Sequence, residues 1–308
     1  MKLYINHPKE NWVVDRFIDE WNTLNFKTSK NLYIGKKVIW LISPWTWKKI
    51  PVYILKKNKV ICTIHHIDED KFDYLEEENF YSRDKFVDVY HVISQKTYEQ
   101  VKKLTNKPIV NFPFWVNQHL WKSIDRKDYI YKKHSLDKNN FYVGSFQRDT
   151  EGSDLKSPKL SKGPDRFLTI VKEMNQQKDG TLVVLLTGKR RNFIIENLEK
   201  EKIKYKYFEM MSFEELNELY NILNLYIVSS RFEGGPQSIM ECAVTKTPII
   251  STDVGIASEI LSPQSIYGMD NFKSAKPDTK TAYKNVQKYL IPAGFHNFNF
   301  AIEGLYES

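Results

Sequence analysis

Apolar residues along this chain gather in short runs that alternate with longer segments of helical periodicity. Clear runs of this kind occupy residues 59–64, 87–93, 182–186 and 226–228. Short apolar runs between polar segments are typical of buried strands, and their alternation with helical segments is typical of parallel sheets flanked by helices. The pattern therefore predicts an α/β fold.

The length of the chain favours two domains rather than one. It has 308 residues, and a single hydrophobic core stops growing at about 250–300 residues. Residues 121–140 are rich in charge and contain no convincing strand, so the linker is expected there. Two α/β domains that face each other form a cleft, and ligands of open α/β sheets bind beyond the carboxyl ends of the strands.

One segment combines a strand, a glycine-rich turn and a helix start. The apolar residues 225–228 are followed by a loop that contains Gly234, Gly235 and Pro236. We expect a helix to begin at the glycines with Pro236 in its first turn, because proline lacks an N–H group that would be unpaired there anyway. The free N–H groups of such a helix start, with its partial positive charge, form a site for phosphate or pyrophosphate.

Two glutamates bracket this turn, eight positions apart. Glu233 precedes the expected helix and Glu241 lies about two turns inside it. Because a diphosphate repels carboxylates, both side chains are expected to accept hydrogen bonds from hydroxyl groups of the same ligand. Hydroxyl groups on both sides of a pyrophosphate describe a nucleotide sugar. The alternative is a simple strand, turn and capped helix with Glu241 on a solvated face.

The surrounding sequence resembles a known family. Residues 229–261 resemble the donor-binding half of retaining GT-B glycosyltransferases, particularly glycosyltransferase family 4 and its relatives with an E-x7-E motif. Similar pieces lie upstream in the expected order, so that the resemblance covers about residues 140–262. They are a first strand and turn at 141–146, a lysine-glycine element at 161–163, a second strand at 182–188 and a helix at 213–220.

The resemblance implies a GT-B fold, in which two Rossmann-like domains face each other across a cleft. Residues 1–135 would form the acceptor-binding domain and residues 136–292 the nucleotide-sugar-binding domain. Residues 293–308 would pack back on the first domain, the alternative being a simple packed tail. The glycine-rich loop that the family usually has after its first strand is absent, because residues 2–5 lead into the polar residues 6–11.

The resemblance also implies catalytic roles. Glu233 would position sugar hydroxyls, while Arg148 and Lys162 would stabilise the departing diphosphate. An insertion, residues 149–160, separates these two cations, and Lys162 has the alternative of an ordinary surface lysine. A histidine near the carboxyl end of the strand at 59–64 would contact sugar or acceptor; we assign His65, although His66 follows it and only one of two adjacent strand residues can face the cleft.

Donor-binding roles follow from the same resemblance. Glu241 would hold the ribose hydroxyls, and the base would lie near residues 209–212. Glu259 has the alternative of a simple helix cap. The implied donor-binding residues are Gly144, Glu209, Met211, Gly234, Gly235, Pro236, Gln237, Ser238, Glu241 and Glu259.

The mechanism implied for the family is retention at the anomeric carbon by front-face attack. It uses no metal and no cofactor, because positive charge and a helix N-terminus replace the metal. The acidic run at residues 68–70 is interpreted as a solvated turn, since consecutive acids point in different directions.

The net charge of +8 and one aromatic segment suggest partners. Tryptophans and lysines at residues 45–51, followed by lysines at 56–59, would suit an anionic membrane surface or an acidic acceptor. Alternatively, Trp47, Ile50 and Ile54 have the spacing of a buried helical face. The expected partners are a nucleotide sugar, a saccharide or glycolipid acceptor and, peripherally, an anionic membrane.

The remaining composition favours a cytoplasmic enzyme. Cys62 and Cys242 lie in apolar segments and are expected to be free core thiols. No secretory signal or membrane-spanning run is visible. Two alternatives to an active glycosyltransferase stay open: a nucleotide-sugar-binding protein without catalysis, and a DNA-modifying glycosyltransferase, which the positive charge would suit.

Overall fold

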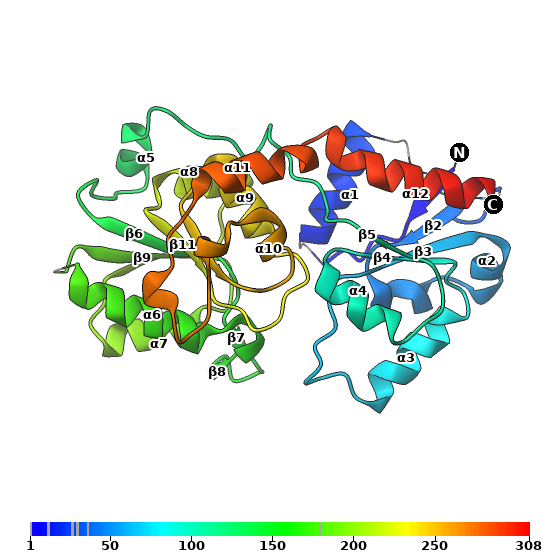
Figure 1. Cartoon of the computed structure of the whole chain (residues 1–308), viewed down its shortest axis with the longest axis horizontal. Coiled ribbons are helices and arrows are strands. Elements are labelled where there is room, and N and C mark those ends of the chain that lie inside the picture. Colours follow the sequence, from blue (N-terminus) through cyan, green and yellow to red (C-terminus); the bar gives the residue numbers. More distant parts are fainter. Residues whose placement is uncertain (1, 11–12, 26–27, 29–30, 36, 179) are drawn as a thin grey trace. The chain divides into compact units, whose positions relative to one another are not determined.

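The computed structural model describes residues 2–10, 13–25, 28, 31–35, 37–178 and 180–308. The chain forms two compact units, one made of Met1–Trp115 with Tyr289–Ser308 and the other of Val116–Lys288. Each unit is a Rossmann-like arrangement of a parallel sheet and helices (Figure 1). The α/β fold predicted from the alternating apolar runs is therefore confirmed.

The first unit is built on a five-stranded parallel sheet whose spatial order follows the sequence. Nearly every residue of β3 is buried, which is the burial expected for a strand covered on both faces. The strands are β1 (Leu3–Ile5), β2 (Val38–Leu41), β3 (Lys59–Ile64), β4 (Val89–Val92) and β5 (Ile109–Asn111).

Alternate residues of these strands feed two separate cores. Trp40 belongs to the core that contains residues of α1, whereas Ile39 and Leu41 belong to the core that contains residues of α2, α3 and α4. This alternation follows from the two-residue period of side chains along a strand. The helices are α1 (Val13–Leu24), the 3₁₀ helix η1 (Pro44–Lys49), α2 (Val52–Lys57), α3 (Tyr74–Asp84) and α4 (Gln95–Lys102).

The C-terminal segment completes the first unit. After η5 (Gln287–Tyr289) and η6 (Ala293–Phe295), α12 (His296–Glu307) packs on β2 and β3, on the face that α1 also covers (Figure 1). Phe298 of α12 is fully buried and contacts Trp40 at a ring-centroid distance of 5.1 Å. By contrast, 82% of Phe300 is exposed, because it lies on the opposite side of the helix.

The second unit contains a six-stranded sheet in the order β10-β9-β6-β11-β12-β13. From β6 the chain proceeds outward through β9 to β10 and then returns to the other side of β6, so the strand order reverses between β6 and β11. The strands are β6 (Phe141–Ser145), β9 (Leu182–Thr187), β10 (Tyr205–Phe208), β11 (Leu225–Val228), β12 (Ile249–Thr252) and β13 (Ile266–Tyr267). Such a reversal creates a crevice beyond the carboxyl ends of the strands.

Helices follow most strands of the second unit. Val143, Val184 and Ile227 of its central strands are fully buried in one core with residues of α6 and α7. The helices are α5 (Asp128–Lys133), η2 (Leu160–Lys162), α6 (Pro164–Gln177), α7 (Asn192–Lys200), α8 (Phe213–Ile222), α9 (Gln237–Thr245), α10 (Ala257–Ile260), η3 (Pro263–Ser265), η4 (Phe272–Ser274) and α11 (Thr279–Val286). α5 lies in the stretch where the sequence predicted the linker.

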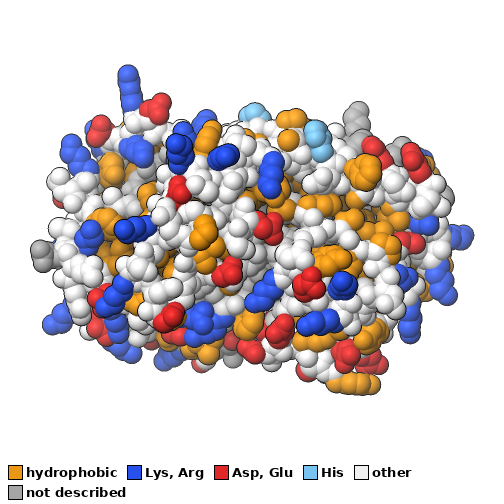
Figure 2. Space-filling model, viewed as in Figure 1, with side chains coloured by type: hydrophobic (Ala, Val, Ile, Leu, Met, Phe, Trp, Pro, Cys, Tyr) orange, Lys and Arg blue, Asp and Glu red, His pale blue; other side chains and the backbone are white. Residues whose placement is uncertain are grey.

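The surface charges are mixed in sign, and the two cysteines are as the sequence analysis expects. Lysine and arginine side chains on the face drawn in Figure 2 are interspersed with acidic ones rather than gathered in one patch. Cys62 and Cys242 are both buried free thiols, as predicted. Within the described ranges, no helix has the length and apolar character needed to span a bilayer.

Candidate active site

The candidate site lies where the strand order of the second unit reverses. Gln147 follows the carboxyl end of β6, and Ser230 and Glu233 follow the carboxyl end of β11. Because β6 and β11 are parallel neighbours, their following loops meet at one edge of the sheet. Lys162, the last residue of η2, joins them from the segment that enters α6.

These four side chains form one connected network. The Lys162 ammonium pairs with Glu233 Oε1, and the same oxygen accepts a hydrogen bond from Ser230 Oγ at 3.1 Å. Ser230 Oγ also lies 3.3 Å from Gln147 Oε1, a second acceptor for its single proton, while Gln147 Nε2 donates to the Lys162 backbone oxygen at 3.0 Å. Lys162 and Ser230 thus both contact Oε1 of Glu233, and among the described residues none donates a hydrogen bond to Oε2.

Gly163 fixes the position of Lys162 against β11. Its φ is +62°, and a Cβ atom built on it would lie 1.9 Å from the Ser229 backbone oxygen. Both the left-handed backbone and the close approach therefore require glycine. Pro164 then begins α6 at the first helical position, where its missing N–H group costs nothing.

A bidentate arginine–carboxylate pair fixes the loop that follows β11. Arg231 makes two bonds with the Asp165 carboxylate, at 2.8 and 2.6 Å, and its backbone N–H donates to the Ser161 oxygen at 2.8 Å. The hydrogen bonds from Arg231 lower the pKa of Asp165. The loop after β11 is thus tied to the start of α6 independently of the Lys162–Glu233 pair.

The glycines precede the helix instead of beginning it. α9 starts at Gln237 and Pro236 caps it with a ψ of 112°, so the expectation that the helix begins at the glycines with Pro236 in its first turn is wrong. An extended ψ cannot belong to a helical turn. Gly255 packs closely against the glycine loop. A Cβ atom built on it would lie 2.1 Å from the Gly234 backbone oxygen, and its φ is +55°, so this position requires glycine.

Glu241 lies inside α9 and is only 5% exposed. Its Oε2 accepts a hydrogen bond from the Tyr220 hydroxyl at 2.9 Å. Burial and the neighbouring Glu241 carboxylate raise the pKa of Tyr220 well above its usual value, so the phenol stays a proton donor. The alternative of Glu241 on a solvated helix face is therefore excluded. Ser238, in the first turn of the helix, forms a hydrogen bond with Tyr226 of β11.

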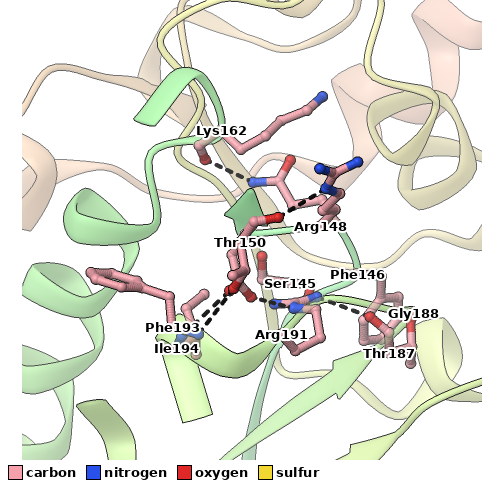
Figure 3. A network of polar contacts seen from close by, with 12 residues as sticks. Ser145, Phe146, Arg148, Thr150, Lys162, Thr187, Gly188, Arg191, Phe193 and Ile194 are labelled. Carbon is pink, nitrogen blue, oxygen red and sulfur yellow. Dashed lines mark hydrogen bonds and ion pairs between the residues drawn. The ribbon is translucent and has the colours of Figure 1, made fainter. Parts of the chain in front are cut away.

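Arg148 lies next in sequence to a buried ion pair, and Figure 3 shows its side chain with Thr150 and Arg191. Its exposed side chain donates through Nε to the Thr150 oxygen at 2.9 Å. Next to it, Asp149 pairs with the fully buried Arg191 at 2.5 Å, and Arg191 also donates to the Ser145 oxygen at 2.6 Å. The insertion after Arg148 continues as a short antiparallel hairpin, β7 (Thr150–Glu151) and β8 (Ser157–Pro158).

Other predicted donor-binding residues lie in separate places of the second unit. Gly144 lies within β6, where a Cβ would clash with the Leu223 side chain at 2.4 Å. Glu209 and Met211 lie in the connection from β10 to α8, and Glu259 lies in the short helix α10. The hydrogen bonds of the Lys162–Glu233 network involve none of these four.

In the first unit, the side chain of His65 packs against neighbouring residues, whereas that of His66 faces solvent. The Nε2 atom of His65 lies 2.8 Å from the Ile42 oxygen and its ring stacks on Phe114 at 5.8 Å. Burial lowers the pKa of His65 to about 4. His91, on the neighbouring strand, is fully buried between Thr63 Oγ1 and the Phe112 oxygen, and burial lowers its pKa to about 3.

These two histidines predict an acid-sensitive fold. An unfolded histidine has a pKa of about 6.5, so the unfolded chain binds the proton first and the free energy of unfolding falls as the pH drops below that value. Each histidine contributes up to about 1.4 kcal/mol per pH unit. Denaturant unfolding measured between about pH 7 and pH 5 should show this loss of free energy of unfolding. His91→Gln should make the free energy of unfolding fall less steeply with decreasing pH, and equal slopes for the variant and the wild type would contradict the role of His91 in the acid sensitivity.

The aromatic segment at residues 45–51 divides between core and surface. Ile50 and Ile54 are buried, and Trp47 packs on Phe86 at 5.8 Å, so these three residues follow the buried alternative. Trp45 is 47% exposed. Its indole Nε1 donates a hydrogen bond to Glu10 Oε1 at 2.9 Å.

Three partners in the second unit were missed from the sequence. Gln147 and Ser230 contact the Lys162–Glu233 network, and Tyr220 contacts Glu241. A signal existed for the first two, since each lies two positions beyond the end of a strand, β6 or β11, that the sequence predicts. Tyr220 lay in a segment assigned only as a helix. Across the described part of the chain, no group of three or more His, Cys, Asp or Glu side chains is placed to hold a metal ion.

One protein-family model matches part of the chain. Residues 157–287 match the model of the family described as glycosyl transferases group 1. This segment contains Lys162, Glu233 and Glu241. It includes neither Gln147 nor any residue of the first unit. No curated protein matches the chain in sequence.

Solved structures are similar over both units. Sucrose-phosphate synthase from Thermosynechococcus elongatus has 13% identity and a TM-score of 0.68, with 96% of this chain and 76% of that chain covered. Anabaena HepE in complex with UDP and glucose has 13% identity and a TM-score of 0.71, with 87% and 78% covered. Staphylococcus aureus TarM, as a variant in complex with fondaparinux, α-GlcNAc-glycerol and UDP, has 13% identity and a TM-score of 0.66, with 88% and 55% covered. These likenesses confirm the predicted fold class, two Rossmann-like halves of the GT-B type.

Proposed function

We propose that this protein is a glycosyltransferase that moves a sugar from a nucleotide-diphosphate sugar to a saccharide-containing acceptor. The observation that carries the proposal is the convergence of Lys162 and Glu233 at the edge where the strand order reverses, directly before the glycine loop and α9. The match of residues 157–287 to glycosyl transferases group 1 supports sugar transfer, and the UDP in the similar structures of HepE and TarM supports a nucleotide donor.

The second unit offers each part of such a donor a suitable group. The ammonium of Lys162 and the N–H groups at the start of α9 suit the diphosphate, because positive charge and free backbone donors stabilise anions. Glu233 has one carboxylate oxygen outside its network, which suits a sugar hydroxyl. Glu241, deeper in α9, suits the ribose hydroxyls.

The proposed reaction breaks the bond between the anomeric carbon and the diphosphate oxygen while the acceptor oxygen bonds to that carbon, and the acceptor hydroxyl gives its proton to the departing diphosphate oxygen. Negative charge then grows on the diphosphate, and Lys162, Arg148 and the α9 N-terminus stabilise it. Preorganised donors of this kind contribute about 3 kcal/mol each at a transition state. By its resemblance to glycosyltransferase family 4, the enzyme retains the configuration at the anomeric carbon and uses no metal ion.

A thermal-shift screen of UDP-, GDP-, ADP-, CMP- and TDP-sugars tests the proposal. A donor at 100 times its Kd stabilises the protein by about 2.7 kcal/mol, which raises the melting temperature measurably. Glu241→Gln should abolish the shift, because the amide keeps the size of this buried side chain but loses its charge.

Glu214→Gln, which alters an exposed acid in the first turn of α8, serves as the matched control and should keep the shift. A wild-type protein that no donor stabilises, and that neither transfers nor hydrolyses any of these sugars, would overturn the proposed function.

A further inference from the structure

Three neighbouring strands of the first unit end beside an exposed indole that the donor chemistry does not use. Trp45 follows β2, Glu10 follows β1 and His65 follows β3. Because β1, β2 and β3 are parallel neighbours, the three residues meet at the carboxyl edge of this sheet. That edge is where open α/β sheets bind ligands.

The indole of Trp45 is both ordered and exposed. Its Nε1 donates to Glu10 Oε1 at 2.9 Å, and its ring lies 6.5 Å from the ring of His65. The next residue, Thr46, is fully buried and its oxygen accepts a bond from Asn6 Nδ2 at 2.9 Å, which fixes the backbone. Yet 47% of Trp45 is exposed, whereas Trp47 is half-buried and four further tryptophans are at most 1% exposed: Trp21, Trp40, Trp115 and Trp121.

The polar groups beside the ring are hydrogen-bond acceptors. His65 Nε2 faces the Ile42 oxygen, so in the neutral ring this nitrogen carries the proton and Nδ1 is the acceptor. Glu10 contributes a carboxylate, of which Oε1 already holds the indole. Acceptors beside an aromatic face suit an uncharged ligand whose hydroxyl groups donate hydrogen bonds and whose C–H groups contact the ring.

We propose that Trp45 is a stacking platform for a pyranose ring, with Glu10 and His65 accepting hydrogen bonds from its hydroxyl groups. The face of an aromatic ring is negative and attracts the slightly positive C–H groups on one side of a sugar ring. Hydrogen bonds to a carboxylate are about twice as strong as those between neutral groups. This inference rests on the proposed function, to which it adds the residues that bind a pyranose ring of the acceptor.

An anionic lipid surface fits this edge less well. Glu10 places a carboxylate in contact with the indole, and a second carboxylate, that of Asp15, accepts a hydrogen bond from the Glu10 N–H at 2.9 Å. Lys48, the nearest lysine along η1, donates to Asn79 of α3 at 2.7 Å and is thereby directed toward that helix. The charges in contact with Trp45 therefore favour a neutral hydroxylated ligand.

Saturation-transfer NMR with the full chain tests the platform. The probes are the methyl glycopyranosides of glucose, galactose, mannose, N-acetylglucosamine and N-acetylgalactosamine. We expect at least one to bind through its ring protons, Trp45→Ala to weaken binding about tenfold and Trp45→Phe, which keeps an aromatic face, to retain most of it. Phe300→Ala removes an aromatic side chain of 82% exposure in the same unit and should bind as the wild type does.

Two results would overturn the inference: no probe binds the wild type, or Trp45→Ala binds as well as the wild type. Flotation with phosphatidylglycerol vesicles is run in parallel, and vesicle binding that depends on Trp45 without sugar binding would assign the platform to lipid instead. The donor-induced thermal shift separates the two proposals, because the donor groups lie in the second unit and Trp45 in the first. A retained shift without sugar binding defeats only the platform. A wild-type protein that shows no shift and neither transfers nor hydrolyses any of the donors defeats the proposed function.

Discussion

Replacing Lys162 by alanine is expected to lower kcat for sugar transfer about 10²–10³-fold, the effect of removing one preorganised donor from a developing oxyanion. The Lys162 ammonium is 23% exposed and pairs with Glu233, which is 11% exposed, so it is held at the loop that precedes α9. Without Lys162, no ammonium group at this position stabilises the negative charge that grows on the diphosphate. The Glu233 carboxylate also loses the cation with which it pairs. Steady-state kinetics with the donor found by thermal shift measures the change.

Lys172→Ala is the matched control for this prediction. Lys172 also pairs with a glutamate, Glu201, in the same unit, but both side chains are more than 40% exposed. Such surface pairs contribute about 0–1 kcal/mol, and kcat should not change. If Lys162→Ala keeps the wild-type donor affinity and turnover, Lys162 does not belong to the active site.

Asp149→Ala is expected to destabilise the second unit by about 3–5 kcal/mol, because it leaves the Arg191 charge buried without a partner. Arg191 is fully buried, and Asp149 is bound to it and to the start of α7 through the Thr150 hydroxyl and the Ile194 N–H. Burial raises the pKa of Asp149, which Arg191 in turn lowers. Hydrogen exchange of β6 and α7 amides reports this unit separately, since two units need not unfold in one transition.

A double variant distinguishes a lost ion pair from general damage. Asp149→Leu combined with Arg191→Met removes both charges and should recover most of the lost stability, as apolar replacements of buried ion pairs often do. Asp154→Ala, at the exposed tip of the same insertion, should have little effect on exchange in α7. A loss below about 1 kcal/mol in Asp149→Ala would show that the pair contributes little.

Several elements of the site could be predicted from local patterns alone. The apolar run at residues 225–228 is the observed β11, and the Glu233 to Glu241 segment forms the expected loop and helix. The prediction that the helix begins at the glycines was wrong, because Pro236 adopts an extended ψ that local composition does not specify. The choice between His65 and His66 also needed the structure, since strand alternation fixes only that one of them faces inward.

Local patterns were enough to predict the α/β alternation, the strand–loop–helix around Glu233 and Glu241, and the free buried cysteines, because each depends on periodicity or composition over a few residues. The folded chain was needed to see the pairing of Lys162 with Glu233, 71 residues apart, and of Asp149 with Arg191, 42 residues apart. It also decided that Trp45 is exposed beside Glu10 while Trp47 packs inward. The two ion pairs arise because the strand order β9-β6-β11 makes neighbours of segments that are distant in the chain, and Trp45 meets Glu10 because β1 and β2 are parallel neighbours. Local periodicity carries no record of either order.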